Sequence, residues 1–215
     1  MCYRQQESID MKIGIIGAGF IGRAVAELAV SHGHHVMISN SRGPETLHSL
    51  ASAVGCEIGT AEESAEFGEI VLIAIPLKNY RSMPVAALAG KVVLDANNYY
   101  PERDGQIVEL DTHQTTTSEL LAQHLPTSKI VKAFNSIRVK ELEVDGQLAG
   151  TPNRRALPIA GDDAEAKQQV SHLLDQFGFD TLDAGPLAQG RLFERGTAPY
   201  CVRYTLPALK QALAI

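Results

Sequence analysis

The chain has 215 residues, of which 45% are hydrophobic and 20% charged, proportions typical of a globular domain with a full core. Its formal net charge is -6, and no run of Lys or Arg is longer than a pair. The sequence therefore lacks the clustered positive charge that a nucleic-acid surface needs. The three cysteines also lack the paired spacing of a zinc site or a disulfide framework. We expect no nucleic-acid partner and no bound metal.

The beginning of the chain is polar. Residues 1–10 contain no apolar stretch of the kind found in a secretion signal, and we expect them to form a flexible extension. The longest apolar run, residues 70–77, is too short to cross a bilayer. These features predict a cytoplasmic protein that does not enter a membrane.

Strand and helix patterns alternate along the rest of the chain. Helical patterns begin near residues 20, 44, 60, 84, 116 and 163, several of them at capping residues. Between them lie short apolar runs typical of strands buried on both faces, which cover residues 11–16, 36–39, 70–75, 92–96, 130–134, 156–160 and 179–183.

Repeated β-α units of this kind predict an α/β protein of the Rossmann type. We expect a doubly wound, mostly parallel sheet in a domain that spans residues 11–186. A short C-terminal helical extension, residues 187–215, would follow, with its two helices separated near Pro199. The polar stretch 99–114 is predicted to be a loop.

A glycine-rich turn follows the first predicted strand and opens the first helix. Its first glycine permits a tight turn, its second lets a pyrophosphate approach the backbone, and its third lets the helix pack on the sheet. The free N–H groups at the start of the helix suit an anion. We therefore predict a dinucleotide-binding site made by Gly17, Ala18, Gly19, Phe20, Ile21 and Gly22.

The end of the second predicted strand indicates which dinucleotide binds. An NAD site usually carries Asp or Glu here, whereas this strand ends in Ser39, Asn40, Ser41 and Arg42. A guanidinium matches phosphate oxygens, and no carboxylate is present to repel them. We assign Ser41 and Arg42, with help from Asn40, to the 2′-phosphate of NADP(H). The alternative is an ordinary polar turn with a solvated arginine.

Polar residues also follow two later strands. Asn97 and Tyr99 come after the strand at 92–96, and Asn135 follows the strand at 130–134. Ligands of open parallel sheets bind outside the carboxyl ends of the strands, so these three residues are candidates for contact with the nicotinamide or the substrate. The alternative is turn-forming asparagines and a tyrosine at the rim.

Other charged groups are predicted to be solvent-exposed. Lys132 lies inside a predicted strand, and its long side chain could extend to an edge of the sheet. A solvated turn at the sheet end opposite the cofactor is predicted to contain His32, His34 and His35. The pair Arg154 and Arg155 is expected to be solvated or to lie at the rim of a dimer. A surface ion pair is expected between Arg191 and Glu194.

Several short segments resemble the NADP-dependent reductases of the deazaflavin coenzyme F-420, whose cofactor domain also occurs in six-transmembrane metalloreductases. They extend from residue 11 to about residue 195, nearly the whole chain. The matching segments are Ile13–Gly19, Ser39–Pro44, Ala74–Pro76, Asp95–Asn98, Lys132–Asn135, Ala160–Asp163 and Asp183–Leu187.

This resemblance implies that NADPH lies over the strand ends, with a flavin-like ring stacked near the nicotinamide. It implies that Ala74, Ile75 and Pro76 pass along the cofactor and that Ala133 and Asn135 lie near the nicotinamide. Related domains reduce deazaflavin, flavin or metal, so the resemblance leaves open the acceptor and the direction of transfer.

The chemistry expected of this chain needs no catalytic side chain. Hydride transfer to a flavin-like ring is carried by the cofactors, and the sequence contains neither a Tyr-x-x-x-Lys pair nor a Gly-x-Ser-x-Gly elbow. We predict an NADP(H)-dependent oxidoreductase with a small-molecule acceptor, deazaflavin coenzyme F-420 or a flavin. The alternatives are an imine or small-carbonyl reductase and a non-enzymatic NADP(H)-sensing module. Apolar residues of the tail, Leu206, Leu209 and Leu213, suggest a homodimer.

Overall fold

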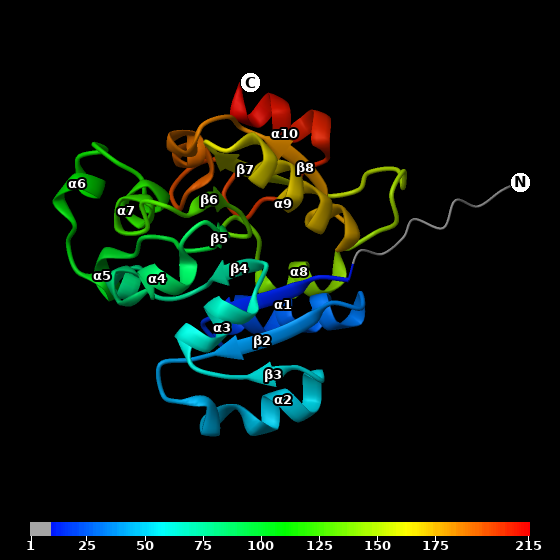
Figure 1. Ribbon diagram of the computed structural model, residues 1–215. Coiled ribbons are helices and arrows are strands. Elements are labelled where there is room, and N and C mark those ends of the chain that lie inside the picture. Colours follow the sequence, from blue (N-terminus) through cyan, green and yellow to red (C-terminus); the bar gives the residue numbers. More distant parts are fainter. Residues whose placement is uncertain (1–9) are drawn as a thin grey trace, which may run out of the picture.

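The computed structural model describes residues 10–215, so the extension predicted at residues 1–10 lies almost entirely outside the described residues. The chain forms one eight-stranded sheet in the order β3-β2-β1-β4-β5-β6-β7-β8 (Figure 1). Strands β1 to β6 are parallel, β7 is antiparallel to β6, and β8 is parallel to β7. The predicted doubly wound, mostly parallel α/β fold is confirmed.

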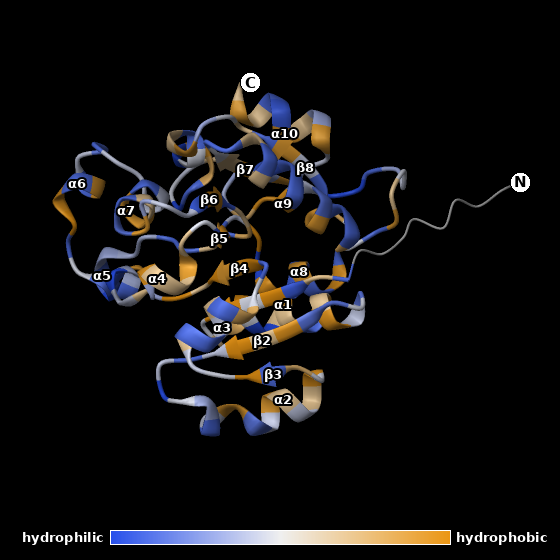
Figure 2. Cartoon of the chain, in the orientation of Figure 1, coloured by the Kyte–Doolittle hydropathy of each residue, from blue (hydrophilic) through white to orange (hydrophobic). Residues whose placement is uncertain are grey.

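The strands are short and mostly buried on both faces, which explains their continuous apolar sequences. Figure 2 shows this as orange strands inside a partly blue shell of helices. The strands are β1 (Lys12–Ile16), β2 (His35–Ser39), β3 (Glu57–Ile58), β4 (Ile70–Ile73), β5 (Val92–Asp95), β6 (Lys129–Lys132), β7 (Ala156–Gly161) and β8 (Asp180–Asp183).

Helices cover both faces of the sheet. One core contains buried residues of α1 (Phe20–Ser31), α8 (Val139–Val144) and α9 (Ala164–Gln176). The core on the other face contains buried residues of α3 (Ala61–Phe67), α4 (Val85–Leu88) and α7 (Thr117–His124).

The predicted capping residues form the expected bonds. Thr60 and Thr116 each make a reciprocal capping box, with Glu63 and Glu119, at the starts of α3 and α7. Asp163 accepts a hydrogen bond from the N–H of Ala166 and so caps α9.

Several regions differ from the sequence prediction. The stretch 99–114, which was predicted to be a loop, contains two single-turn helices. The segment before β7 contains helix α8, although the sequence shows no strong helical periodicity there. The predicted helix at 44–54 begins as a 3₁₀ helix. Strands β4 and β6 end two residues early, because Ile75 donates its N–H to a side chain and Phe134 has a φ of 61°. The remaining short helices are η1 (Pro44–Leu47), α2 (His48–Val54), η2 (Leu77–Ser82), α5 (Pro101–Asp104) and α6 (Val108–Asp111).

The C-terminal extension packs on the sheet of its own chain. It consists of the 3₁₀ helix η3 (Leu187–Phe193) and helix α10 (Leu206–Leu213), which lies beside β7 and β8 (Figure 1). Leu209 and Leu213 are buried there with Phe193. Two of the three leucines that suggested a homodimer are therefore covered by the chain itself, whereas Leu206 is 37% exposed, and the homodimer stays a prediction. No helix of residues 10–215 is long and apolar enough to span a bilayer.

Candidate functional site

A cleft of about 330 Å³ opens at the carboxyl ends of β1 and β4. The strand order reverses between these two strands, which is where ligands of open α/β sheets bind. Three segments that the sequence singled out separately line the cleft together, namely 17–19, 40–42 and 74–76. Ala61 and three residues of the η2 region, Asn79, Ser82 and Met83, complete its wall.

The glycines of the first segment differ in the space around them. Gly17 has a φ of 115°, and a Cβ added to it would collide with the carbonyl oxygen of Ala74. A Cβ on Gly22 would collide with the carbonyl of Gly17. Gly19 begins α1 with ordinary dihedral angles, and a Cβ there would meet nothing within 4 Å. The first and third glycines are thus required by the fold, whereas Gly19 leaves open space for a ligand.

The next two residues of the motif are not part of the lining of the cleft. Phe20 is 82% exposed at the start of α1, and Ile21 packs against the core. Their contribution to a cofactor site would come from their backbone N–H groups, which stand at the positive end of the helix.

A local turn shapes the second segment. The Asn40 side chain accepts a hydrogen bond from the N–H of Arg42 at 2.8 Å and donates one to the Thr46 hydroxyl at 2.8 Å. This turn holds Asn40 in place and leaves Ser41 and Arg42 exposed at the wall of the cleft. The cleft wall carries no carboxylate. The arrangement suits an anionic group, as the sequence indicated.

The two asparagines that follow β5 and β6 are buried rather than exposed. Asn97 is 2% and Asn135 3% exposed. The Asn97 oxygen accepts the N–H of Ile75 at 2.9 Å, and the Asn135 amide nitrogen donates to the carbonyl of Phe193 at 3.0 Å. These bonds fix both amide groups; the first connects the end of β4 with the end of β5, and the second connects the end of β6 with η3. Asn97 Nδ2 and Asn135 Oδ1 have no hydrogen-bond partner within residues 10–215.

Tyr99 holds the segment that follows it. Its hydroxyl donates to Asp111 Oδ1 at 3.0 Å and accepts from the N–H of Ile107 at 2.9 Å. Ala133 is fully buried in the core. The structure therefore places Asn97, Ala133 and Asn135 beneath the surface at the ends of β5 and β6, and Tyr99 at the edge of this region.

Lys132 has a position that the sequence prediction missed. Its side chain was expected to extend to an edge of the sheet, but it is fully buried, with its aliphatic stem against Gly190. Its ammonium donates to Thr117 Oγ1 at 2.6 Å and forms an ion pair with Glu194 Oε1 at 3.0 Å. It also lies 3.4 Å from the carbonyl oxygen of Asn97. The expected surface pair of Arg191 with Glu194 is wrong, because Glu194 turns inward to Lys132.

A second carboxylate belongs to this buried cluster. Asp95, the last residue of β5, is fully buried and accepts from Ser118 Oγ at 2.6 Å and from the N–H of Asn97 at 3.0 Å. Burial raises the pKa of Asp95, against the opposing effect of Lys132. Burial also acts to raise the pKa of Glu194, but Lys132 and Thr117 outweigh it and keep that pKa below its usual value. The cluster thus favours an ionised Glu194 paired with Lys132.

One other expectation of exposed charge is wrong, and a second holds only in part. Arg154 and Arg155 are buried and form ion pairs with Asp175 and Asp180, and with Glu141 and Asp145, respectively. In the histidine turn, His32 and His35 are exposed as expected, whereas His34 is 4% exposed and its burial lowers its pKa. Among residues 10–215, no group of three or more His, Cys, Asp or Glu side chains is placed to hold a metal ion.

The fold and the cleft define a Rossmann-type nucleotide-binding protein. Residues 12–99 match the model of the family described as NADP oxidoreductase, coenzyme F420-dependent. The chain is therefore related to the NADP-dependent oxidoreductases, and the resemblance seen in its sequence segments is confirmed. The predicted class of enzyme, an NADP-dependent oxidoreductase, is supported at the level of the family.

Sequence similarity to individual curated proteins supports this relationship. The chain is 34% identical over 185 residues to metalloreductase STEAP3 of Rattus norvegicus, an alignment that covers 85% of this chain and 36% of that protein. It thus spans about a third of the length of the curated relatives it matches.

Solved structures match over most of their length. The hypothetical protein SMa0349 from Sinorhizobium meliloti superposes with a TM-score of 0.77 at 27% identity, covering 92% of this chain and 96% of that chain. A "putative F420 dependent NADP-reductase" from Arthrobacter sp. FB24 superposes with a TM-score of 0.73 at 25% identity, covering 84% and 87%.

Proposed function

We propose that the chain binds NADPH in the cleft at the ends of β1 and β4 and transfers hydride between it and a flavin-like acceptor, a deazaflavin or a flavin. One observation carries the cofactor part of the proposal. The open space at Gly19 and the exposed Ser41-Arg42 pair lie in the same cleft, at positions suited to a pyrophosphate and a 2′-phosphate. Bound NADPH would supply the hydride, and the chain would bind, orient and exclude water.

The 2′-phosphate assignment predicts a selective loss. The Arg42→Ala variant should bind NADPH about 10- to 100-fold more weakly, because a hydrogen bond to a charged group contributes roughly 1.5–3 kcal/mol. Its affinity for NADH should stay nearly unchanged, since NADH has no 2′-phosphate. Calorimetric titration of both nucleotides into both proteins tests this. An equal loss for NADH would show that Arg42 supports the loop and not the phosphate.

The acceptor is proposed from the family description and from the region around β5 and β6. We expect the nicotinamide to meet its acceptor above the buried residues Asn97, Ala133 and Asn135, none of which is an acid or base. We propose a deazaflavin or flavin, with metal reduction, the activity named for the STEAP3 relative, as an outcome to be tested. Oxidation of NADPH by deazaflavin, FMN, FAD, ferric chelates and quinones separates these acceptors. Turnover of imines or carbonyls alone would favour the alternative reductase, and no turnover would favour an NADP(H)-sensing module.

The proposed chemistry predicts modest effects at the strand ends. The Asn97→Ala, Tyr99→Phe and Asn135→Ala variants should each lose about tenfold in rate or less, because they position groups and transfer no proton. A general acid or base typically contributes about 10²–10⁴-fold. The rate should vary little with pH, and deuterium on the transferred face of NADPH should appear in the reduced acceptor. A thousandfold loss in one variant, together with the disappearance of a limb of the rate–pH profile, would identify a true catalytic side chain.

Two finer expectations also remain proposals. We expect the chain to act in the cytoplasm, where its free thiols Cys56 and Cys201 would stay reduced, and to form a homodimer. Cell fractionation and light scattering of the purified chain would test them.

A further inference from the structure

A second cleft, of about 550 Å³, lies beside the ends of β5 and β6. Its volume is within the range of small-molecule sites. Tyr99 and Leu110 provide an apolar part of its lining, and Thr117 and Glu194 provide a polar part. The cleft adjoins the proposed acceptor region, because Tyr99 is two residues from Asn97 and Thr117 accepts a bond from Lys132.

The polar part of the lining offers a hydrogen-bond acceptor. Glu194 Oε1 is bonded to Thr117 and paired with Lys132. Its other oxygen, Oε2, has no hydrogen-bond partner within the described residues, and the side chain is 21% exposed. The ammonium of Lys132 compensates the negative charge. This part of the cleft therefore suits hydroxyl groups, which donate to a carboxylate oxygen.

Two guanidinium groups lie at the rim, and they differ in how they are held. Arg195 Nη2 donates a hydrogen bond to Glu102 Oε1 at 2.8 Å, and Arg195 Cζ lies 4.5 Å from the centroid of the Tyr100 ring, over which it stacks. Arg191 donates only its Nε, to the carbonyl of Ala188, and its side chain is 48% exposed.

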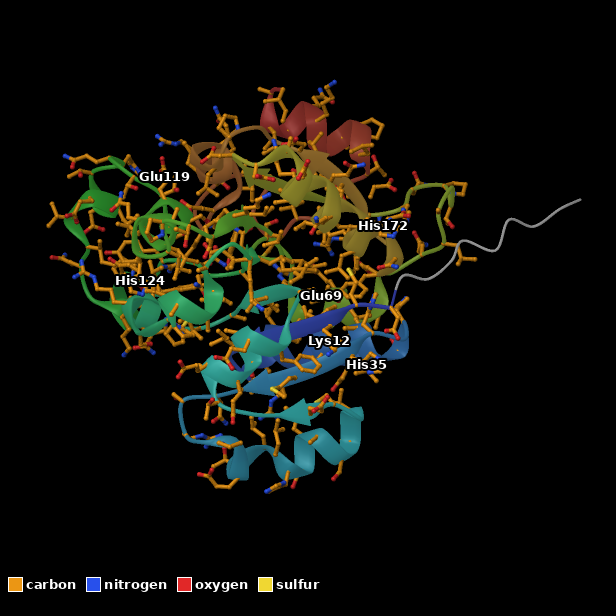
Figure 3. The ribbon with its side chains drawn as sticks, in the orientation of Figure 1. Lys12, His35, Glu69, Glu119, His124 and His172 are labelled. Carbon is orange, nitrogen blue, oxygen red and sulfur yellow. The ribbon has the colours of Figure 1, made fainter. Side chains whose placement is uncertain are left out.

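Arg191 forms a long ion pair with Glu119 that includes no hydrogen bond. Nη2 of Arg191 lies 4.0 Å from Glu119, beyond hydrogen-bond distance. Figure 3 shows Glu119 at the end of the molecule that carries α6 and α7, away from Lys12, His35 and Glu69. The terminal nitrogens of Arg191 are thus available for an anion, with His113 also at the rim.

We propose that this cleft binds the hydroxylated, phosphate-bearing side chain of the flavin-like acceptor, with Arg191 contacting the phosphate and Glu194 the hydroxyl groups. The ring would then lie toward Asn97 and Asn135, where the nicotinamide is expected. This inference rests on the proposed function, which supplies the ring. It adds to that function which part of the acceptor is recognised, the phosphate-bearing side chain, and which residue contacts the phosphate, Arg191.

The test compares FMN with riboflavin, which lacks the phosphate. Flavin fluorescence is titrated with the protein in the presence of NADP⁺, so the readout is binding and needs no turnover. Wild type should bind FMN more tightly than riboflavin. Arg191→Ala should weaken FMN binding about 10- to 100-fold and leave riboflavin unchanged, because only the charged bond is lost. Arg191→Lys should restore part of the FMN affinity.

Arg203→Ala is the matched control, since Arg203 is a half-exposed arginine outside the cleft. It should leave both affinities unchanged. Equal binding of FMN and riboflavin by wild type, or equal losses in Arg191→Ala, would overturn the assignment of the phosphate while the acceptor proposal stands. If neither flavin nor deazaflavin binds the wild type, the flavin-like acceptor and this inference both fail.

Discussion

A valine at position 19 should abolish NADPH binding while the protein still folds. Gly19 has a φ of -76°, which any residue adopts, and a Cβ there would meet nothing within 4 Å. The same open space is where a pyrophosphate must approach the backbone. Loss of two backbone bonds to the charged pyrophosphate would weaken binding by about 3–6 kcal/mol, or roughly two to four decades. Calorimetry for binding, with circular dichroism for the fold, measures both effects.

Gly17→Ala is the matched control for a glycine that the fold itself requires. Its φ of 115° is strained for alanine, and the new Cβ would collide with the Ala74 carbonyl. This variant should lose thermal stability as well as binding, whereas Gly19→Val should lose binding alone. A folded Gly19→Val protein that still binds NADPH with wild-type affinity would remove the phosphate loop from the proposed site.

The fold could be predicted from the sequence because local signals agreed with one another. Strands buried on both faces give continuous apolar runs, and the capping boxes at Thr60 and Thr116 give fixed spacings that mark helix starts. Short elements gave no such signal. Strand β3 has two residues, and α5 and α6 are single turns within a polar stretch, so no periodicity can develop in them.

The sequence singled out the segments 17–19 and 40–42, which line one cleft, because each segment carries its own pattern; their role in cofactor binding stays a prediction. The sequence did not predict where distant residues meet. The burial of Lys132 was missed because its partners, Thr117 and Glu194, come from other elements. Arg154 was misjudged for the same reason, since Asp175 and Asp180 reach it from α9 and β8. The available signal was a lysine at the end of an otherwise apolar strand, because a charge in such a place needs a partner.

The Lys132→Met variant should lose about 3 kcal/mol of folding free energy at neutral pH. Removing one member of a buried ion pair typically costs about 3–5 kcal/mol, and the partial exposure of Glu194 favours the lower end. For a protein of this size, this corresponds to a fall in Tm of about 6–12 °C. The methionine keeps the apolar stem beside Gly190, so the loss should come from the two carboxylates, Asp95 and Glu194, that remain without the ammonium.

The dependence of this loss on pH distinguishes charge from packing. In the wild type, the lowered pKa of Glu194 means that its contribution to stability is present above the unfolded pKa and is lost as pH falls through the folded pKa. In Lys132→Met, burial acts without the opposing ammonium, so the folded pKa values of both carboxyls should be raised. Stability is then regained as pH falls through these raised values, and the difference from wild type should shrink between neutral pH and about pH 5.

A second substitution isolates the pair. Glu194→Gln keeps an oxygen that can accept from Thr117, and in the Lys132→Met background it should restore part of the stability, with a coupling of about 0.5–3 kcal/mol. Urea unfolding of wild type, both single variants and the double variant at the two pH values gives the complete cycle. A loss in Lys132→Met that is the same at both pH values and is not relieved by Glu194→Gln would mean that Lys132 acts through packing alone. In that case, the charges of Lys132, Asp95 and Glu194 would not be what holds the ends of β5 and β6 and the C-terminal segment together.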